Sequence, residues 1–113
     1  MIYLASPYSF DPERGYAYAL AGFHYLLQRR KALVYSPILH FHHYAKKIGG
    51  KIDSATWWEH NEGMLRRAER LVIYAAAEWR KSHGVMAEYG FAKYQGIEVE
   101  LLLPDDAPWE EFA

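Results

Sequence analysis

The chain has 113 residues and a formal net charge of −1, with 51% hydrophobic and 24% charged residues. This length supports a single domain, and the near-neutral charge excludes a general electrostatic attraction to nucleic acid or anionic membranes. The absence of cysteine excludes disulfides and thiol nucleophiles, and no apolar run approaches the roughly 18 residues that span a bilayer, so we expect a cytoplasmic protein without membrane partners.

The first part of the chain predicts a strand, a long helix and a second strand. Residues 2–5 form a short apolar run, which is typical of a buried strand. Asp11 or Ser9 caps a helix that carries apolar residues at helical spacing over residues 12–30. Residues 32–36 form the second strand, and a crossover this long between two strands implies parallel pairing.

The rest of the chain continues the alternation of strands and helices. The expected elements are a loop or short helix over 37–50, a helix from a cap at Asp53 or Ser54 to about Arg67, a strand over 71–75, a helix opening at His83 or Gly84 behind the cap Ser82, and a strand over 97–103. This pattern predicts a three-layer, flavodoxin- or Rossmann-like α/β domain over residues 1–103 with a small parallel sheet of four or five strands. The acidic tail, 104–113, either packs on a neighbouring surface or trails from the domain.

Ligands of such sheets bind outside the carboxyl ends of the strands. That rule gathers three predicted loops at one edge, over residues 6–11, 37–43 and 76–84. The helix start behind Ser82 would present unpaired backbone N–H groups to an anion there. Glu88, just inside that helix, would face the same crevice.

Glu88 has no evident structural role in the sequence. It stands at the wrong distance from Ser82 for a capping box, and no oppositely charged residue lies three or four positions away. Gly84, one turn back, leaves room for a ligand to approach the carboxylate. The alternative is a solvated glutamate on a helix surface.

Other residues near this edge are candidate ligand-binding groups. Hydroxyl, imidazole and guanidinium groups suit a phosphate or sugar, and flat aromatic rings suit a base; ordinary capping, surface and core roles are the alternatives. A zinc site is not expected, because the histidines at positions 40, 42 and 43 lack helical metal-pair spacing. The polar candidates are Ser6, Tyr8, Ser9, Arg14, His40, Ser82 and His83, and the stacking candidates are Tyr8, Trp57, Trp58 and Trp79.

Several stretches in the right order resemble the nucleoside 2-deoxyribosyltransferase-like superfamily, in particular a small, mostly uncharacterised bacterial and phage branch of it. The similarity runs over about residues 2–102. It rests on Tyr3-Leu4-Ala5-Ser6-Pro7-Tyr8-Ser9, Arg14, Val34-Tyr35-Ser36-Pro37-Ile38 with His40, and Trp79 to Glu88 with Ala92 and Gly96.

The resemblance implies roles for particular residues. Glu88 corresponds to the nucleophile and Tyr8 to the tyrosine that helps to set it. Ser82 resembles the phosphate-binding serine of the deoxynucleoside 5'-monophosphate N-hydrolases, where transferases of unphosphorylated nucleosides tend to carry aspartate. Glu69 occupies a place where relatives often carry aspartate. The resemblance also implies a homodimer or larger assembly and no cofactor.

The resulting hypothesis is cleavage of an N-glycosidic bond with retention, in which Glu88 forms a glycosyl-enzyme that water or a second base resolves. Glu69, His40 and His83 are alternative proton donors to the leaving base. Base identity, the sugar, and hydrolysis or transfer stay open. Two other functions stay open too: a nucleotide-binding protein without turnover, and an assembly module that uses its aromatic surface.

Overall fold

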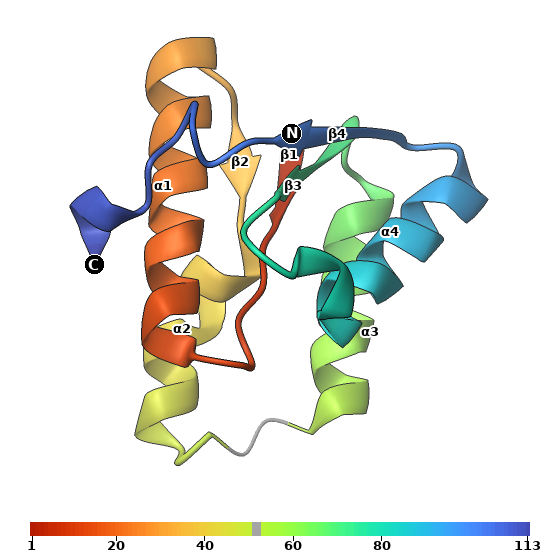
Figure 1. Cartoon of the computed structure of the whole chain (residues 1–113). Helices are drawn as coiled ribbons and strands as arrows, with labels where there is room; N and C mark the ends of the chain where they lie inside the picture. The colour runs from red at the N-terminus through yellow and green to blue at the C-terminus, as the bar shows by residue number, and fades with distance from the viewer. Residues whose placement is uncertain (51–52) are drawn as a thin grey trace.

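The computed structural model describes residues 1–50 and 53–113, and its centre is a sheet of four parallel strands (Figure 1). The strands are β1 (Ile2–Ala5), β2 (Val34–Tyr35), β3 (Arg70–Tyr74) and β4 (Glu98–Leu102). Their spatial order is β2-β1-β3-β4, which matches the first four strands of a flavodoxin-like sheet. The predicted fold class is therefore confirmed, with four strands and a second strand shorter than expected.

Four helices connect the strands. They are α1 (Pro12–Arg30), α2 (Pro37–Lys47), α3 (Ser54–Arg66) and α4 (His83–Gln95), with short 3-10 turns η1 (Trp79–Lys81) and η2 (Glu110–Phe112). The segment expected as a loop or short helix is the helix α2. Proline at its first position and the side chain of Ser36, which accepts a hydrogen bond from the backbone N–H of Leu39 at 3.1 Å, explain where it begins.

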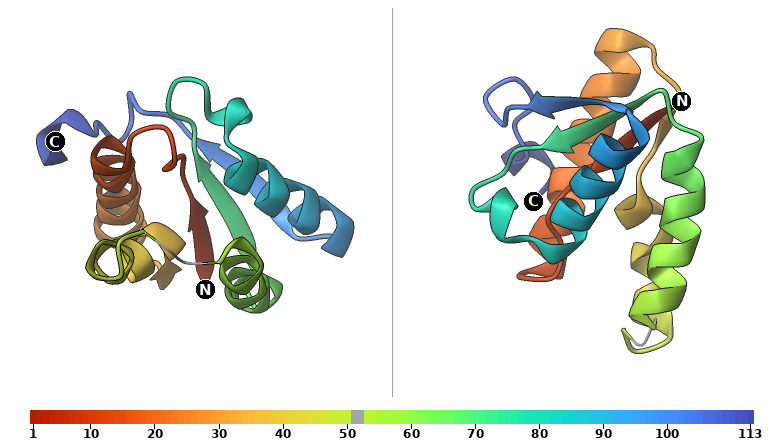
Figure 2. Two further views of the ribbon diagram at one scale, coloured as in Figure 1. Left: turned by 90° about the horizontal axis from the view of Figure 1, so that it is seen from below. Right: turned by 90° about the vertical axis from the view of Figure 1, so that its right-hand side faces the viewer.

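Alternate residues of the strands pack on opposite faces of the sheet. Leu4, Val72 and Tyr74 join a buried cluster with α1, whereas Tyr3, Ala5 and Ile73 join a second cluster with α3 and α4. The right-hand view of Figure 2 shows α4 in front of the strands and α1 behind them. The alternation follows from the two-residue period of a strand, and it places every odd-numbered β1 side chain beneath α4.

The C-terminal residues belong to the same core. Ala107 is buried, and its carbonyl accepts a hydrogen bond of 2.6 Å from the hydroxyl of Tyr74. Trp109 packs edge-on against Tyr18 of α1, with ring centroids 5.3 Å apart. Of the two alternatives expected for the tail, the structure shows the one in which it packs on a neighbouring surface, that of α1. Within the residues that the structure describes, no helix is long and apolar enough to cross a membrane.

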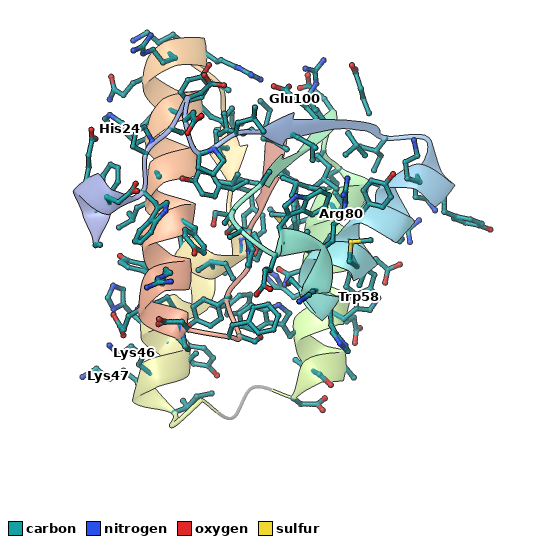
Figure 3. The ribbon with its side chains drawn as sticks, in the orientation of Figure 1. His24, Lys46, Lys47, Trp58, Arg80 and Glu100 are labelled. Atoms are coloured by element: carbon teal, nitrogen blue, oxygen red, sulfur yellow. The ribbon has the colours of Figure 1, made fainter. Side chains whose placement is uncertain are left out.

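An ion-pair cluster ties β4 to its neighbours. Glu100, which is labelled in Figure 3, accepts hydrogen bonds of 2.8 Å from both Arg30 of α1 and Arg70 of β3. Arg30 and Arg70 hold the pKa of Glu100 at about 2. This cluster fixes the end of α1 against the edge strand.

The crevice expected from the fold lies between β1 and β3. These strands are adjacent, but the chain leaves β1 for α1 on one face and leaves β3 for α4 on the other. The loop after β1 also packs directly on α1, since a Cβ atom at Gly15 would lie 2.8 Å from the carbonyl oxygen of Pro7. Glycine at this position thus lets the loop sit at the mouth of the crevice.

Candidate active site

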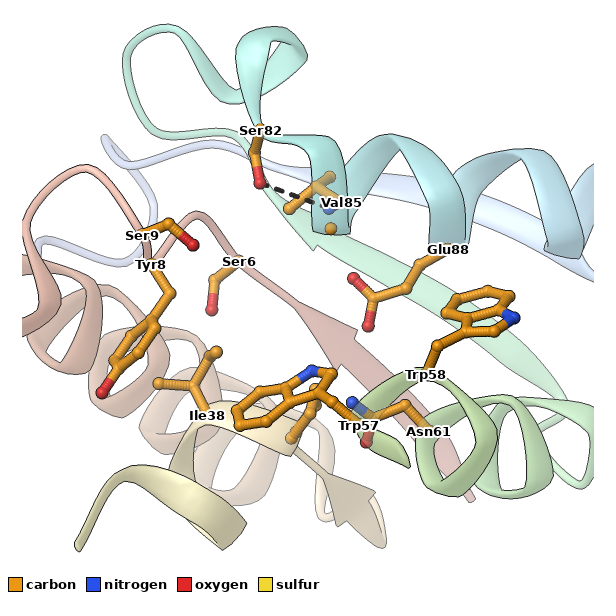
Figure 4. A pocket seen from close by; sticks show the side chains of 12 residues that line it. Ser6, Tyr8, Ser9, Ile38, Trp57, Trp58, Asn61, Ser82, Val85 and Glu88 are labelled. Atoms are coloured by element: carbon orange, nitrogen blue, oxygen red, sulfur yellow. Dashed lines mark hydrogen bonds between the residues drawn. The ribbon is translucent and has the colours of Figure 1, made fainter. Parts of the chain in front are cut away.

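Two neighbouring cavities lie at the carboxyl ends of β1 and β3. The inner cavity has a volume of about 100 Å³, and the outer cavity has about 850 Å³. Both are lined by Tyr8, Ser9, Trp57, Trp58 and Gly84. The inner cavity is completed by Ser6, Pro37, Ile38, Asn61, Ser82, Val85 and Glu88 (Figure 4). The loop after β1, the start of α2, one face of α3 and the start of α4 thus meet around one space.

Glu88 points into the inner cavity and is 7% exposed, so it is not a solvated surface glutamate. Among the described residues it forms no salt bridge, and its carboxylate accepts a hydrogen bond from the hydroxyl of Tyr3. Burial raises the pKa of Glu88 to about 7, although the hydrogen bond from Tyr3 acts in the opposite direction. The carboxylate is therefore poised to exchange a proton near neutral pH.

Tyr3, which the sequence analysis did not identify as a site residue, is the side chain that holds Glu88. It is fully buried on the face of β1 beneath α4, and burial together with the charge of Glu88 raises its pKa, so its hydroxyl stays protonated and donates. The hydroxyl of Tyr8 instead lies 2.8 Å from Nδ1 of His42, a buried ring that stacks on Tyr16. The contact expected between Tyr8 and Glu88 is thus corrected to one from Tyr3.

The start of α4 forms the upper wall of the inner cavity. Ser82 caps this helix, with its Oγ accepting from the backbone N–H of Val85 at 3.2 Å, as the sequence predicted. Accepting this bond leaves the hydroxyl proton of Ser82 to be donated to another group. A Cβ atom at Gly84 would meet no other atom within 4 Å, so the glycine opens the wall to a ligand. Together these groups suit an anion.

Two buried polar atoms of the inner cavity have no hydrogen-bond partner among the described residues. They are Oγ of Ser6 and Nδ2 of Asn61, whose side chains are 5% and 1% exposed. Buried polar groups are normally paired, so these atoms point to a polar ligand. Asn61 was not a predicted site residue. A signal was present in the sequence, since Asn61 lies four residues before the apolar Leu65 and shares its buried helix face.

Five predicted residues do not line the inner cavity, and they are Arg14, Trp79, Glu69, His40 and His83. Arg14 is exposed and sits over the ring of Trp109, 5.2 Å from its centroid, because the C-terminal segment packs on α1. Trp79 packs against the core beneath α4 and carries Arg80 over its ring. Neither side chain lines the inner or the outer cavity.

The predicted proton donors occupy three different places. The carboxylate of Glu69 accepts a hydrogen bond of 2.7 Å from the amino group of Met1. Because Glu69 immediately precedes β3, it lies at the end of the sheet opposite the two cavities. His40 lines a separate groove of about 570 Å³ between α2 and α3, where it stacks on His60. His83 lines the outer cavity. Of the three, His83 is the one near the candidate site.

Comparison of the chain with known protein families, with curated proteins and with solved structures finds no match in any of the three. The resemblance drawn from the sequence motifs therefore stays a prediction. In the part of the chain that the structure describes, no group of three or more histidine, aspartate or glutamate side chains is arranged to hold a metal ion.

Proposed function

We propose that this protein cleaves the N-glycosidic bond of a (deoxy)nucleoside 5'-monophosphate through a covalent glycosyl-Glu88 intermediate. The observation that carries the proposal is the burial of one carboxylate, without a cationic partner among the described residues, in a cavity between β1 and β3. Such a carboxylate is costly for folding. A nucleophilic role explains why it is there.

In the proposed first step, an oxygen of the ionised Glu88 attacks C1' of the sugar. The bond from C1' to the base nitrogen breaks, and its electron pair leaves with the base. Tyr3 holds the carboxylate during the attack. The leaving base takes up a proton, for which His83 is the proposed donor because it lines the outer cavity. Water, or a second base, then displaces Glu88 from C1'.

The proposed binding mode assigns the remaining parts of the substrate to the cavity walls. The phosphate binds Ser82 and the start of α4, with Ser9 on the facing loop. The base lies in the outer cavity against Trp57 and Trp58, whose rings also contact Phe41 and Phe91 at centroid distances of 4.7 and 5.8 Å. Those contacts hold both indoles in place.

A second candidate function is nucleotide binding without turnover. Retaining glycosidases usually employ two carboxylates, whereas Glu88 is the one carboxylate that lines the inner cavity among the described residues. A single carboxylate with a raised pKa is able to bind a ligand without catalysing its cleavage.

The proposal includes a cytoplasmic location, the expected homodimer or larger assembly, and no nucleic-acid or membrane partner.

The deciding experiment incubates the protein with ribo- and deoxyribonucleoside 5'-monophosphates and measures free base by chromatography. We expect release of at least one base, and none from the Glu88→Gln variant, which keeps the acceptor for Tyr3 but loses the nucleophile. Heat stabilisation by a nucleotide without base release would instead support the binding function. Base release by Glu88→Gln at the wild-type rate would overturn the proposed mechanism.

A further inference from the structure

A short chain of hydrogen bonds leads from the surface of α3 to the inner cavity. The hydroxyl of Tyr35, on β2, donates to Oδ1 of Asn61 at 3.1 Å and lies 3.4 Å from Nδ1 of His60. The ring of Tyr35 packs against Tyr3, with centroids 5.5 Å apart. The side chains of His60, Tyr35 and Asn61 are thus fixed relative to the tyrosine that binds Glu88.

The chemistry of these groups determines which atom donates in each of the hydrogen bonds. Oδ1 of Asn61 only accepts hydrogen bonds, so the single hydroxyl proton of Tyr35 is used in that bond. A hydrogen bond between the Tyr35 oxygen and Nδ1 of His60 then requires this nitrogen to be the donor. The amide nitrogen of Asn61 is left on the cavity side, as Figure 4 shows.

The amide nitrogen of Asn61 therefore offers hydrogen-bond donors that none of the described residues accepts. It is buried, unpaired and aimed into the inner cavity, where Oγ of Ser6 is unpaired as well. The inner cavity, at about 100 Å³, is much smaller than the outer cavity, at about 850 Å³. The smaller space suits one small polar ring, and the larger one suits a base.

We propose that Asn61 is a sugar-binding residue, whose Nδ2 donates to a hydroxyl oxygen of a furanose ring held in the inner cavity, and that Tyr35 is the positioning residue that orients its amide. Ser6 supplies the second contact to the same ring. This inference rests on the proposed function, because it assigns the group bound beside Glu88. Under this inference, Asn61 and Ser6 are the residues by which the site binds a sugar phosphate differently from inorganic phosphate.

The test measures binding by calorimetry and needs no turnover. The probes are ribose 5-phosphate, 2-deoxyribose 5-phosphate and inorganic phosphate. Asn61→Leu keeps the size of the side chain and removes both donors. We expect it to weaken binding of at least one sugar phosphate by about tenfold or more while leaving the affinity for inorganic phosphate unchanged.

Tyr35→Phe provides the second variant, since its phenyl ring keeps the contact with Tyr3. We expect it to weaken binding of the same sugar phosphate by about threefold in the wild-type background and to have no effect in the Asn61→Leu background. A merely structural role of Tyr35 would give the same loss in both backgrounds. Should Asn61→Leu fail to fold, the same comparison is made in an Asn61→Ser background.

The outcomes separate this inference from the proposed function. If folded Asn61→Leu binds both sugar phosphates as tightly as the wild type does, the assignment of Asn61 is overturned and the proposed function stands. If the wild-type protein binds neither sugar phosphate nor any nucleoside monophosphate, the proposed function fails and the sugar assignment fails with it.

Discussion

The hydroxyl of Tyr3 donates a hydrogen bond to the carboxylate of Glu88 across 85 residues of sequence. Tyr3 comes from the second residue of β1 and Glu88 from the second turn of α4, so the contact exists only when the helix is packed on the sheet. It holds the buried carboxylate of the inner cavity in place. The consequences for stability and for the proposed activity are measurable.

Burial of Glu88 should make the stability of the protein depend on pH. Its pKa is raised from 4.5 to about 7, so between these values the folded protein keeps a proton that the unfolded chain has lost. The stability contributed by this group therefore falls as the pH rises through that range. The free energy of unfolding of Glu88→Gln minus that of the wild type should therefore rise by about 3 kcal/mol as the pH goes from about 4 to about 8. Denaturant titrations at both pH values measure this change.

Glu59→Gln is the control for this measurement, because Glu59 is an exposed residue of α3. Its curve of stability against pH should run parallel to that of the wild type. If the Glu88→Gln curve also runs parallel, Glu88 titrates like a solvated carboxyl and the buried geometry is wrong.

Tyr3→Phe should shift the pH dependence of the proposed reaction. The ionised carboxylate is the nucleophile, so kcat/KM of the wild type should rise with pH through about 7. The hydrogen bond from Tyr3 lowers the pKa of Glu88, and its loss should move this rise upward by about one pH unit. Tyr8→Phe, which removes a hydroxyl bonded to His42, should leave the midpoint unchanged. A shift in Tyr8→Phe alone would restore the role expected from the sequence.

Ser82→Asp should discriminate against phosphorylated substrates. Aspartate is also a good N-cap, so α4 keeps its first turn, but the added charge repels a phosphate by several kcal/mol near a protein surface. We expect kcat/KM for monophosphates to fall by about 100-fold or more and that for nucleosides to change little. Ser82→Asn, a neutral cap, is the matched control. Equal losses for both substrate types would remove the phosphate from the proposed site.

Gly84→Ala should stabilise the protein and weaken ligand binding. A methyl group there meets no atom within 4 Å, and alanine is favoured over glycine in a helix by about 0.5–1 kcal/mol. The same methyl projects into the cavities that Gly84 lines, so we expect about tenfold weaker binding of nucleoside monophosphates. Thermal unfolding with and without ligand measures both effects.

Gly90→Ala is the control on the same helix. Its methyl group also meets no atom within 4 Å, but Gly90 lines neither the inner nor the outer cavity. It should gain the same stability and keep its affinity. Loss of affinity in both variants would show that stiffening of α4 matters, and not space at the cavity wall.

The position of Glu69 away from the candidate site follows from the sequence itself. Glu69 immediately precedes the third strand, and the rule that ligands bind at the carboxyl ends of parallel strands already places it at the other edge of the sheet. Its contact with the amino group of Met1 agrees with that position. Arg14 is different, because its place over Trp109 depends on where the C-terminal segment docks.

The amino-acid sequence by itself determined the elements and the edge at which they meet. Apolar runs, the caps Asp11 and Ser82 and the alternation of strands and helices act locally, so the parallel sheet and the candidacy of Glu88 follow from neighbouring residues. Only the tertiary structure decided that Tyr3 binds Glu88 and that Asn61 offers an unpaired amide. These contacts depend on which face of β1 lies beneath α4 and on how α3 is rotated against the sheet, and such relationships are set by packing between segments far apart in the chain.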